Sequence, residues 1–193
     1  MKGRESGMPA EVTWEGFFDA SCILGMLVAP NHSSVSVAEF GSGYGTFTLP
    51  LARLTAGRVH ALDIESGLIE RLSVAATKAG LDNVVPTLRD FLTDGTGLRD
   101  ESIDHAMLYN ILHIENPISL LDEAYRIVRP GGSVSVVHWR SDIPTPRGPS
   151  LSIRPSPAQI HTWLSETGFS EIHDVELVCS PYHFGIRALR TAD

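Results

Sequence analysis

The stretch that decides the fold is VAEFGSGYGTFTLPLA, residues 37–52. A short apolar run ends in Glu39, and three glycines follow at alternate positions, Gly41, Gly43 and Gly45. Glycine lets the backbone turn sharply and approach a ligand closely. A glycine-rich loop between a strand and a helix therefore predicts a site for a nucleotide-like ligand.

The spacing of these glycines narrows the choice of ligand. The dinucleotide fingerprint places its third glycine one residue later, where this chain has Thr46. A P-loop is excluded, because no Gly-Lys-Ser/Thr sequence follows. The carboxylate of Glu39 would repel a pyrophosphate, and it would suit a ligand that carries an ammonium group and a sulfonium.

Strand-like and helix-like segments alternate along the rest of the chain. Apolar residues at helical spacing between Glu11 and Val28 predict one amphipathic helix or two short ones. Strands are expected at 33–40, 57–65, 83–91, 103–112 and 133–139, with two more between 171 and 190. Helices are expected at 45–56, 66–80, 117–128 and 156–168, the last with Ser156 as its N-cap. Pro86 favours an edge position for the third strand, and the segment from Arg129 to Gly132 is expected to be the turn before the fifth.

This alternation predicts a single α/β domain over residues 1–193. The expected fold is Rossmann-like and doubly wound, with a mostly parallel seven-stranded sheet, helices on both faces and a C-terminal antiparallel hairpin. Ser180 and Pro181 lie at the expected junction of the two hairpin strands. Ligands of such sheets bind at the carboxyl ends of the strands, where all the candidate site residues lie.

Composition limits the classes of function. The net charge is −8 and the sequence pI is about 5.4, which disfavours extended nucleic-acid binding and attraction to anionic membranes. Cys22 and Cys179 lie far apart without metal-ligand spacing, so we expect neither a metal site nor a disulfide framework. The N-terminus lacks the apolar core of a secretory signal, and no apolar stretch is long enough to span a bilayer. A cytoplasmic location is expected.

Five segments of the chain resemble the motifs of one family, the class I S-adenosylmethionine-dependent methyltransferases. The similar segments are EFGSGYG (39–45), ALDIESGLIERL (61–72), LRDF (88–91), DHAMLYNILHIENP (104–117) and RIVRPGGSVSVVHW (126–139). The resemblance covers roughly residues 34–139. Within the family, the chain is most similar to the small-molecule group that includes quinone-biosynthesis methyltransferases.

The resemblance implies S-adenosylmethionine as cofactor and S-adenosylhomocysteine as product. It implies that Asp63 accepts hydrogen bonds from the ribose hydroxyls, that Asp90 and Phe91 contact the adenine, and that Asn110 borders the methyl-transfer site. Taken alone, Asp90 is equally compatible with a helix cap. The full set of expected cofactor-binding residues is Glu39, Gly41, Ser42, Gly43, Gly45, Asp63, Ile64, Asp90, Phe91 and Asn110.

Two histidines are candidates for a catalytic base. His113 follows Asn110 by three residues, and His138 closes the fifth expected strand. Both lie at carboxyl ends of strands, and a base helps when the methyl acceptor is a hydroxyl or an acidic carbon. His183 is a weaker candidate. The alternative for each is a histidine hydrogen-bonded to a loop carbonyl.

Two segments are expected to contact the substrate. Residues 140–156 form a long, proline-rich loop that contains Arg140, Arg147 and Arg154. One or more of these arginines are candidates for holding a carboxylate or phosphate, with Arg147 the best placed and Arg140 the second choice. The alternative is that the loop arginines pair with surface acids. Residues 1–30 are expected to form a helical cap that brings Trp14 and Phe18 to the site, although these rings would also suit the core.

We therefore expect methyl transfer to a small molecule, which an arginine-lined pocket would allow to be anionic. The alternatives are a non-catalytic regulatory protein that binds S-adenosylmethionine or S-adenosylhomocysteine, a nicotinamide-dependent oxidoreductase, and methylation of a macromolecule. Arsenic methylation would need several thiolates and is disfavoured, because the chain has two cysteines. The acceptor atom stays open, and a homodimer is an open alternative to a monomer.

Overall fold

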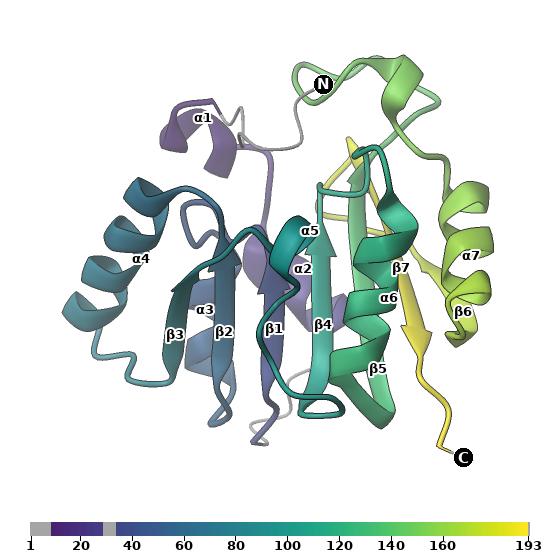
Figure 1. Cartoon of the computed structure of the whole chain (residues 1–193). Helices are drawn as coiled ribbons and strands as arrows, with labels where there is room; N and C mark the ends of the chain where they lie inside the picture. The colour runs from purple at the N-terminus through teal and green to yellow at the C-terminus, as the bar shows by residue number, and fades with distance from the viewer. Residues whose placement is uncertain (1–8, 29–33, 193) are drawn as a thin grey trace.

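The computed structural model describes residues 9–28 and 34–192, which fold around one seven-stranded sheet (Figure 1). The order of the strands across the sheet is β3-β2-β1-β4-β5-β7-β6. Their bounds are Val37–Phe40 (β1), Val59–Asp63 (β2), Val84–Leu88 (β3), Ile103–Tyr109 (β4), Val128–Trp139 (β5), Ser170–Val175 (β6) and His183–Leu189 (β7). The helices are Glu11–Glu15 (α1), Ala20–Leu27 (α2), Thr48–Leu54 (α3), Ser66–Lys78 (α4), Phe91–Asp94 (α5), Pro117–Ile127 (α6) and Pro157–Glu166 (α7), with a 3₁₀ turn at Leu151–Ile153.

The topology confirms the predicted fold class. Strands β1 to β5 pair in parallel, whereas β7 runs antiparallel to both β5 and β6. The strand order reverses between β1 and β4, and the glycine loop follows β1 directly. A crevice that binds ligands is expected at such a switch point, outside the carboxyl ends of the strands.

Helices cover both faces of the sheet, with α5 and α6 in front and α2 and α3 behind in the view of Figure 1. The front core packs Leu121 of α6 and Leu164 of α7 against strand residues such as Leu108. The rear core packs Leu27 of α2 and Leu51 of α3 against the other face. Each fully buried leucine contributes about 1.5–3 kcal/mol relative to an exposed one, so the two layers hold the strand ends in place.

Local sequence signals explain where several elements begin. Ser156 caps α7 through a capping box with Gln159, as the sequence predicts. Pro50 is the third residue of α3, where its missing N–H costs no helical hydrogen bond. Strand β3, which contains Pro86, lies at the edge of the sheet, and this position confirms the prediction.

One predicted turn is part of a strand. The segment from Arg129 to Gly132 was expected to precede the fifth strand, but β5 begins at Val128 and includes it. The Gly131 N–H donates to the carbonyl of Arg190, and the Arg190 N–H donates to the carbonyl of Gly132. The local turn signal was outweighed by this pairing with the residue that follows β7, which a local sequence pattern does not contain.

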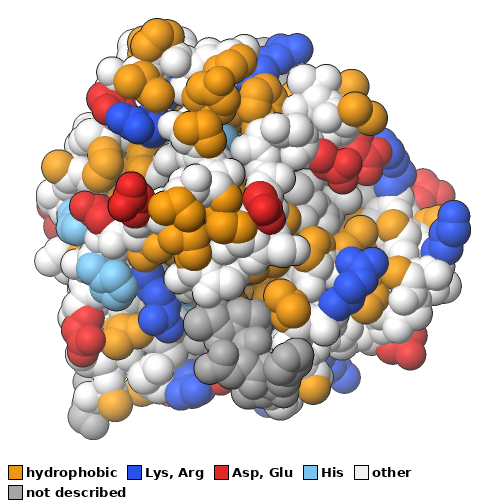
Figure 2. Space-filling model, turned by 180° about the vertical axis from the view of Figure 1, so that it is seen from behind, with side chains coloured by type: hydrophobic (Ala, Val, Ile, Leu, Met, Phe, Trp, Pro, Cys, Tyr) orange, Lys and Arg blue, Asp and Glu red, His pale blue; other side chains and the backbone are white. Residues whose placement is uncertain are grey.

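The N-terminal cap consists of two helices, α1 and α2, as one of the two sequence alternatives predicted. Residues 1–8 and 29–30 of the predicted cap lie outside the described residues. No helix in the described ranges combines the length and the apolar character that crossing a membrane requires. On the face opposite to Figure 1, Lys and Arg side chains of the described residues lie among acidic and hydrophobic ones and form no continuous basic stripe (Figure 2).

Candidate active site

The glycine loop needs glycine at all three positions for a backbone reason. Gly41, Gly43 and Gly45 have φ angles of 77°, 53° and 81°, in the region that side chains with a Cβ rarely adopt. A Cβ on Gly45 would also lie 2.5 Å from Cδ1 of Leu72 in α4. The loop is therefore packed closely against α4, while Gly41 at its start is exposed.

Two buried carboxylates support this loop. Glu39 is 2% exposed and accepts a hydrogen bond from the Thr48 hydroxyl at the start of α3, and its burial raises its pKa to about 8. Asp63 accepts from the N–H of Gly43 at 2.8 Å and from the N–H of Glu65 at 3.0 Å. Burial raises the pKa of Asp63 although these amides oppose the change. Each oxygen of Asp63 has a second lone pair, so the carboxylate can still accept from ligand hydroxyls.

The residues expected at the adenine lie beside Asp63. The Arg89 N–H donates to the Asp63 carbonyl at 2.7 Å, so the ends of β2 and β3 are adjacent. Asp90 caps α5 by accepting from the N–H and the hydroxyl of Thr93, which matches the helix-cap alternative. Phe91 packs in the core, with its ring 5.5 Å from that of Phe40. Asp90 can bind a ligand only with the lone pairs that its hydrogen bonds to Thr93 leave free.

Asn110 has an unusual backbone and an unsatisfied side chain. It follows β4 with a φ of 56°, and its amide oxygen and amide nitrogen are both buried without a hydrogen-bond partner among residues 9–28 and 34–192. The same holds for the buried hydroxyls of Ser42 and Thr46 in the glycine loop. A Cβ on Gly41 would lie 3.2 Å from Cδ1 of Ile111, so the loops after β1 and β4 touch.

Buried polar atoms in folded proteins almost always have a partner, because leaving one unpaired costs about 1–3 kcal/mol. The unsatisfied atoms gather in the two loops at the switch point of the sheet. They fit a ligand that has several donors and acceptors.

The predicted base candidates, His113 and His138, lie together. Nε2 of His138 is 3.4 Å from Nδ1 of His113, and Nδ1 of His138 is 3.1 Å from the carbonyl oxygen of Trp139. Burial lowers the pKa of His138 to about 3 and also lowers the pKa of His113. The alternative of a histidine hydrogen-bonded to a loop carbonyl therefore holds for Nδ1 of His138, while Nε2 of His138 contacts the ring of His113.

His183 occupies the same end of the sheet but is enclosed. Its Nδ1 lies 2.9 Å from the Ser180 hydroxyl, and its Nε2 is buried without a partner. Its ring centroid is 4.1 Å from that of Trp139 and 4.6 Å from that of Phe18. Burial lowers the pKa of His183 to about 3, so it is neutral at pH 7. No group of three or more His, Cys, Asp or Glu residues in the described part of the chain is arranged to hold a metal.

The substrate-side loop is organised by Arg154, the one of its three arginines that the sequence favoured least. Arg154 is 8% exposed, and it donates to the carbonyl oxygens of Pro149, Arg140 and Arg147 at 2.8, 2.8 and 3.2 Å. Its guanidinium also lies over the Trp139 ring. The charge stays buried because three loop carbonyls take its hydrogen bonds.

The two arginines that the sequence favoured are less enclosed. Arg140 is paired with Asp142 at 2.6 Å, and Arg147 is exposed. The pairing of Arg140 follows the surface-acid alternative. The sequence held no local signal that would separate Arg154 from the other two, because only the folded loop brings its three carbonyl partners together.

Aromatic rings join the N-terminal cap to this end of the sheet. Phe18 lies 4.8 Å from Trp14 and 5.3 Å from Phe47, while Phe17 lies 5.3 Å from Trp139. The cap is also held at the glycine loop, where the Tyr44 hydroxyl donates to the Pro9 carbonyl at 3.0 Å. Phe18 is thus in contact with several rings of this cluster and Trp14 with Phe18, and both side chains are half-buried.

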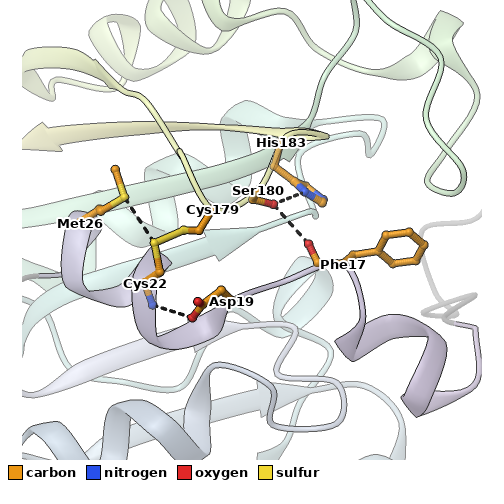
Figure 3. Close-up of a disulfide and its surroundings, with 7 residues drawn as sticks. All are labelled: Phe17, Asp19, Cys22, Met26, Cys179, Ser180 and His183. Carbon is orange, nitrogen blue, oxygen red and sulfur yellow. Dashed lines mark hydrogen bonds between the residues drawn. A yellow bond between two sulfur atoms is a disulfide. The ribbon is translucent and has the colours of Figure 1, made fainter.

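The two cysteines form a disulfide, which corrects the sequence expectation (Figure 3). Cys22 in α2 is bonded to Cys179 in the β6–β7 connection, 157 positions away in sequence, and their Cα atoms are 6.5 Å apart. Sequence distance carried no information here, because pairing depends on proximity in the fold. Disulfides persist mainly in oxidising compartments, so this bond counts against the predicted cytoplasmic location.

Beside the disulfide, hydrogen bonds connect the N-terminal cap to His183. Ser180 follows Cys179 and its hydroxyl lies 3.3 Å from the Phe17 carbonyl, to which it donates (Figure 3). The same hydroxyl then accepts from Nδ1 of His183. The cap, the β6–β7 connection and His183 are therefore fixed to one another within a few residues.

Comparisons with known proteins agree with this geometry. Residues 38–136, half of the chain, match the family described as "Methyltransferase domain". A SAM-dependent methyltransferase from Aquifex aeolicus is similar in structure, with a TM-score of 0.76 and 20% identity over 91% of each chain. A SAM-dependent O-methyltransferase from Thermotoga maritima has a TM-score of 0.63 and 18% identity over 91% of this chain and 65% of that one.

The same fold also occurs in the [4+2]-cyclase SpnF, with a TM-score of 0.74 and 15% identity over 98% of this chain and 86% of that one. At these identities, structural likeness demonstrates the fold alone. No curated protein sequence matches the chain.

Proposed function

The chain belongs to the methyltransferase-domain family, and on this premise we propose that it transfers a methyl group from S-adenosylmethionine to a small, anionic acceptor. The observation that carries the proposal is the set of buried, partnerless polar atoms of Ser42, Thr46 and Asn110 around the glycine loop. S-adenosylmethionine offers amino, carboxylate and hydroxyl groups that would satisfy such atoms.

The residues around the loop fit this cofactor. The glycine loop would receive its methionine portion, and the spare lone pairs of Asp63 would accept from its ribose hydroxyls. Asp90 and the main chain at Phe91 lie next to Asp63 and would meet its adenine. When bound, the cofactor supplies a methyl group that its own sulfonium already activates.

The protein's own contribution is to orient the acceptor, exclude water and take up a proton. The aromatic cluster of the cap would help to exclude water, and Trp139 at its centre is 2% exposed. The loop of residues 140–156 packs on the same ring at Gly148, where an added Cβ would lie 2.7 Å from it. We assign the role of base to His113.

An anionic acceptor is favoured by the charges of the substrate-side loop. Arg154 is nine-tenths buried and has no carboxylate partner in the described ranges, so it places an uncompensated positive charge beside His113 and His138. Arg147 would meet the acceptor at the exposed rim. The motif likeness to quinone-biosynthesis methyltransferases supports a small aromatic acid of that kind, and the absence of a basic stripe on the face in Figure 2 agrees with a small molecule rather than nucleic acid.

The test measures binding of S-adenosylhomocysteine by calorimetry in Asn110→Gly. Glycine tolerates the φ of 56° at this position, so the variant removes the amide without straining the backbone. We expect at least a tenfold rise in Kd with an unchanged or higher melting temperature, because lost hydrogen bonds to the ligand cost about 1.5 kcal/mol or more. Glu171→Gly is the matched control, since Glu171 has a φ of 47° in β6 and is exposed.

An unchanged Kd in Asn110→Gly would contradict the assignment of the site. Binding of NADH in place of S-adenosylhomocysteine would favour the oxidoreductase alternative. If the cofactor binds but mass spectrometry detects no methylated product from a panel of hydroxybenzoates and the matching hydroxybenzamides, the non-catalytic alternative is favoured. Preference for the benzoates over the benzamides would support an anionic acceptor.

A further inference from the structure

The hydrogen bond between His113 and His138 has a defined donor and acceptor, and the inference drawn from it rests on the proposed function. We propose that His138 is a positioning residue that fixes the proton of His113 on Nδ1, so that Nε2 of His113 is the nitrogen that accepts the proton of the methyl acceptor. The assignment separates two residues that the sequence left as equivalent candidates. It follows from the hydrogen-bond partners of each ring nitrogen.

The assignment of protons starts from His138, the more deeply buried of the two histidines. Nδ1 of His138 lies 3.1 Å from the Trp139 carbonyl, and a carbonyl can only accept, so Nδ1 of His138 carries a proton. His138 is fully buried, and this burial lowers its pKa to about 3, so the ring is neutral at pH 7. A neutral imidazole has one proton, and Nε2 of His138 is therefore bare.

The protonation of His138 determines which nitrogen of His113 carries a proton. The bare Nε2 of His138 can only accept, so across the 3.4 Å between the rings it is Nδ1 of His113 that donates. Burial and the charge of Arg154 both lower the pKa of His113, which is likewise neutral. Its Nε2 is consequently bare, and within the described ranges this atom has no hydrogen-bond partner. The chain of bonds thus ends in a lone pair three residues after Asn110.

His183 does not compete for this role. If the Ser180 hydroxyl donates to the Phe17 carbonyl, Nδ1 of His183 must donate to that hydroxyl, and Nε2 of His183 is bare as well. That nitrogen, however, is fully buried, in a ring that contacts those of Phe18 and Trp139. An acceptor cannot reach it without opening the aromatic cluster.

The proposed step balances without another reactant. The O–H, N–H or acidic C–H bond of the acceptor breaks, and its proton goes to Nε2 of His113. The electron pair left on the acceptor forms the bond to the methyl carbon, whose bond to sulfur breaks with that pair remaining on sulfur. Arg154 disfavours the imidazolium that results, so His113 readily passes the proton to water and returns to its neutral form.

The decisive experiment needs neither cofactor nor acceptor. Long-range ¹H–¹⁵N NMR of the histidine side chains reports which nitrogen of each ring carries the proton. We expect His113 of the wild-type protein to be protonated on Nδ1. His105, whose two nitrogens each lie 2.7 Å from a serine hydroxyl, and the exposed His173 serve as internal references. A wild-type spectrum with the proton on Nε2 of His113 would overturn the proposal by itself.

Two substitutions at His138 sharpen the test. In His138→Gln the amide oxygen can stand near the former Nε2 and accept from His113, so we expect the Nδ1 tautomer to persist. His138→Asn is too short to reach that point, and we expect a mixture of tautomers. His161→Gln, which removes a surface histidine paired with Asp174, is the control for changes that do not concern the pair.

Turnover and binding separate this inference from the proposed function. We expect kcat to fall about 10- to 100-fold in His138→Asn and to stay within about threefold in His138→Gln, with the Kd for S-adenosylhomocysteine unchanged in both. Equal turnover in both variants, or equal losses in kcat and Kd, would contradict a positioning role. Failure of the wild-type protein to bind S-adenosylhomocysteine would refute the proposed function and would leave the NMR result to stand or fall alone.

Discussion

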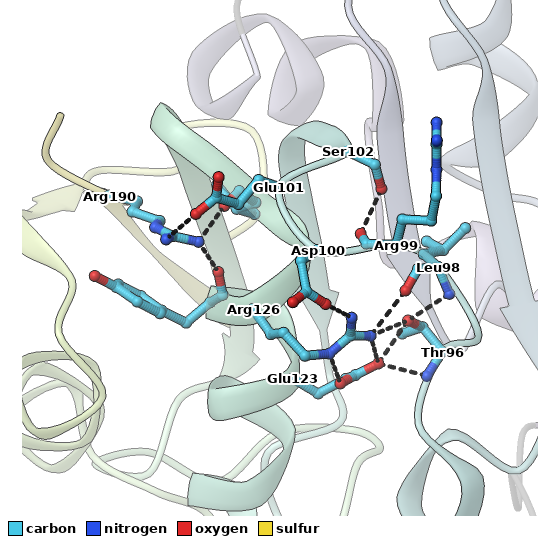
Figure 4. Close-up of polar contacts among 11 residues, drawn as sticks. Thr96, Leu98, Arg99, Asp100, Glu101, Ser102, Glu123, Arg126 and Arg190 are labelled. Atoms are coloured by element: carbon cyan, nitrogen blue, oxygen red, sulfur yellow. Dashed lines mark hydrogen bonds and ion pairs between the residues drawn. The ribbon is translucent and has the colours of Figure 1, made fainter. Parts of the chain in front are cut away.

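The two ends of the sheet treat their polar groups in opposite ways. At the end where the parallel strands begin, Arg126 donates to Glu123 at 2.7 and 2.8 Å and also to Asp100 (Figure 4). Glu123 further accepts from the N–H and the hydroxyl of Thr96. Arg190 pairs with Glu101 in the same region. Charged groups here have partners on neighbouring loops, which ties those loops to the sheet.

At the carboxyl ends of the strands the same kinds of groups are left incomplete. The amide of Asn110 and the hydroxyl of Ser42 have no partners, Glu39 has an elevated pKa, and Arg154 has no acid beside it in the described ranges. The contrast teaches that the first end is arranged for stability and the second for a ligand. Removing polar groups at the first end should therefore destabilise the fold without changing binding. Removing them at the second end should alter binding or turnover, and it can even stabilise the fold.

The largest effect is expected from His113→Ala. Loss of the base should lower kcat by about 10²–10⁴, because a general base typically contributes that much. The Kd for S-adenosylhomocysteine should change by less than about threefold. Steady-state kinetics together with calorimetry measure both quantities, and parallel losses in the two would mean that His113 supports the site instead of acting in it.

A second effect has the opposite sign from most substitutions of a buried residue. The folded pKa of Glu39 is about 8, above the ordinary 4.5, so its contribution to stability is complete below pH 4.5 and is lost as the pH rises to 8. Glu39→Gln removes the cost of burying an ionised carboxylate at high pH. We therefore expect the variant to be more stable than the wild-type protein at pH 8 by about 2 kcal/mol. The advantage should shrink toward pH 4.5.

Urea unfolding at several pH values measures this difference. An advantage of Glu39→Gln that is the same at every pH would show that the carboxylate does not titrate as described. Above pH 8, where Glu39 of the wild-type protein is charged, the same variant should bind S-adenosylmethionine more weakly, because it lacks a negative charge for the ammonium group.

The smallest effect is expected at the paired end. Burial alone would raise the pKa of Glu123, but hydrogen bonds from Arg126 and Thr96 hold it at about 2. Its contribution is therefore present above pH 4.5 and is lost as the pH falls toward 2. Glu123→Gln should lower the free energy of unfolding at pH 7 by about 1 kcal/mol, since Arg126 is partly exposed and solvent weakens the pair.

The difference between Glu123→Gln and the wild-type protein should disappear near pH 2–3, and cofactor affinity should not change. Chemical denaturation with a parallel binding measurement tests both statements. Asp142→Asn, which breaks the exposed pair with Arg140, is the control and should leave stability unaltered. A loss of cofactor binding in Glu123→Gln would contradict the view that this end of the sheet serves stability and not ligand binding.

Local patterns in the sequence predicted the parts of the fold that local physics decides. The glycine loop, the edge position of the Pro86 strand and the Ser156 cap each depend on a few neighbouring residues, and the structure confirms them. Apolar runs placed Asp63 and Asn110 at the ends of strands, whereas their roles in the site were implied only by the resemblance to the family. Their proposed contacts with a cofactor remain predictions.

Features that depend on distant residues escaped the sequence. The bond between Cys22 and Cys179 requires α2 and the β6–β7 connection to meet, and the enclosure of Arg154 requires a folded loop. The roles of His113 and His138 also separate only when the Trp139 carbonyl is in place. In each case the decisive partner is contributed by the folded arrangement and not by the spacing of the residues themselves.

The disulfide has one more consequence, which concerns the integrity of the chain. It closes a covalent ring that runs from residue 22 to residue 179 and contains six of the seven strands, β1 to β6, together with helices α3 to α7. A protease that cuts the exposed part of the 140–156 loop, at Arg147 for example, opens this ring but releases no fragment. The piece that carries the β6–β7 hairpin stays attached to the piece that carries the glycine loop until a reductant separates them.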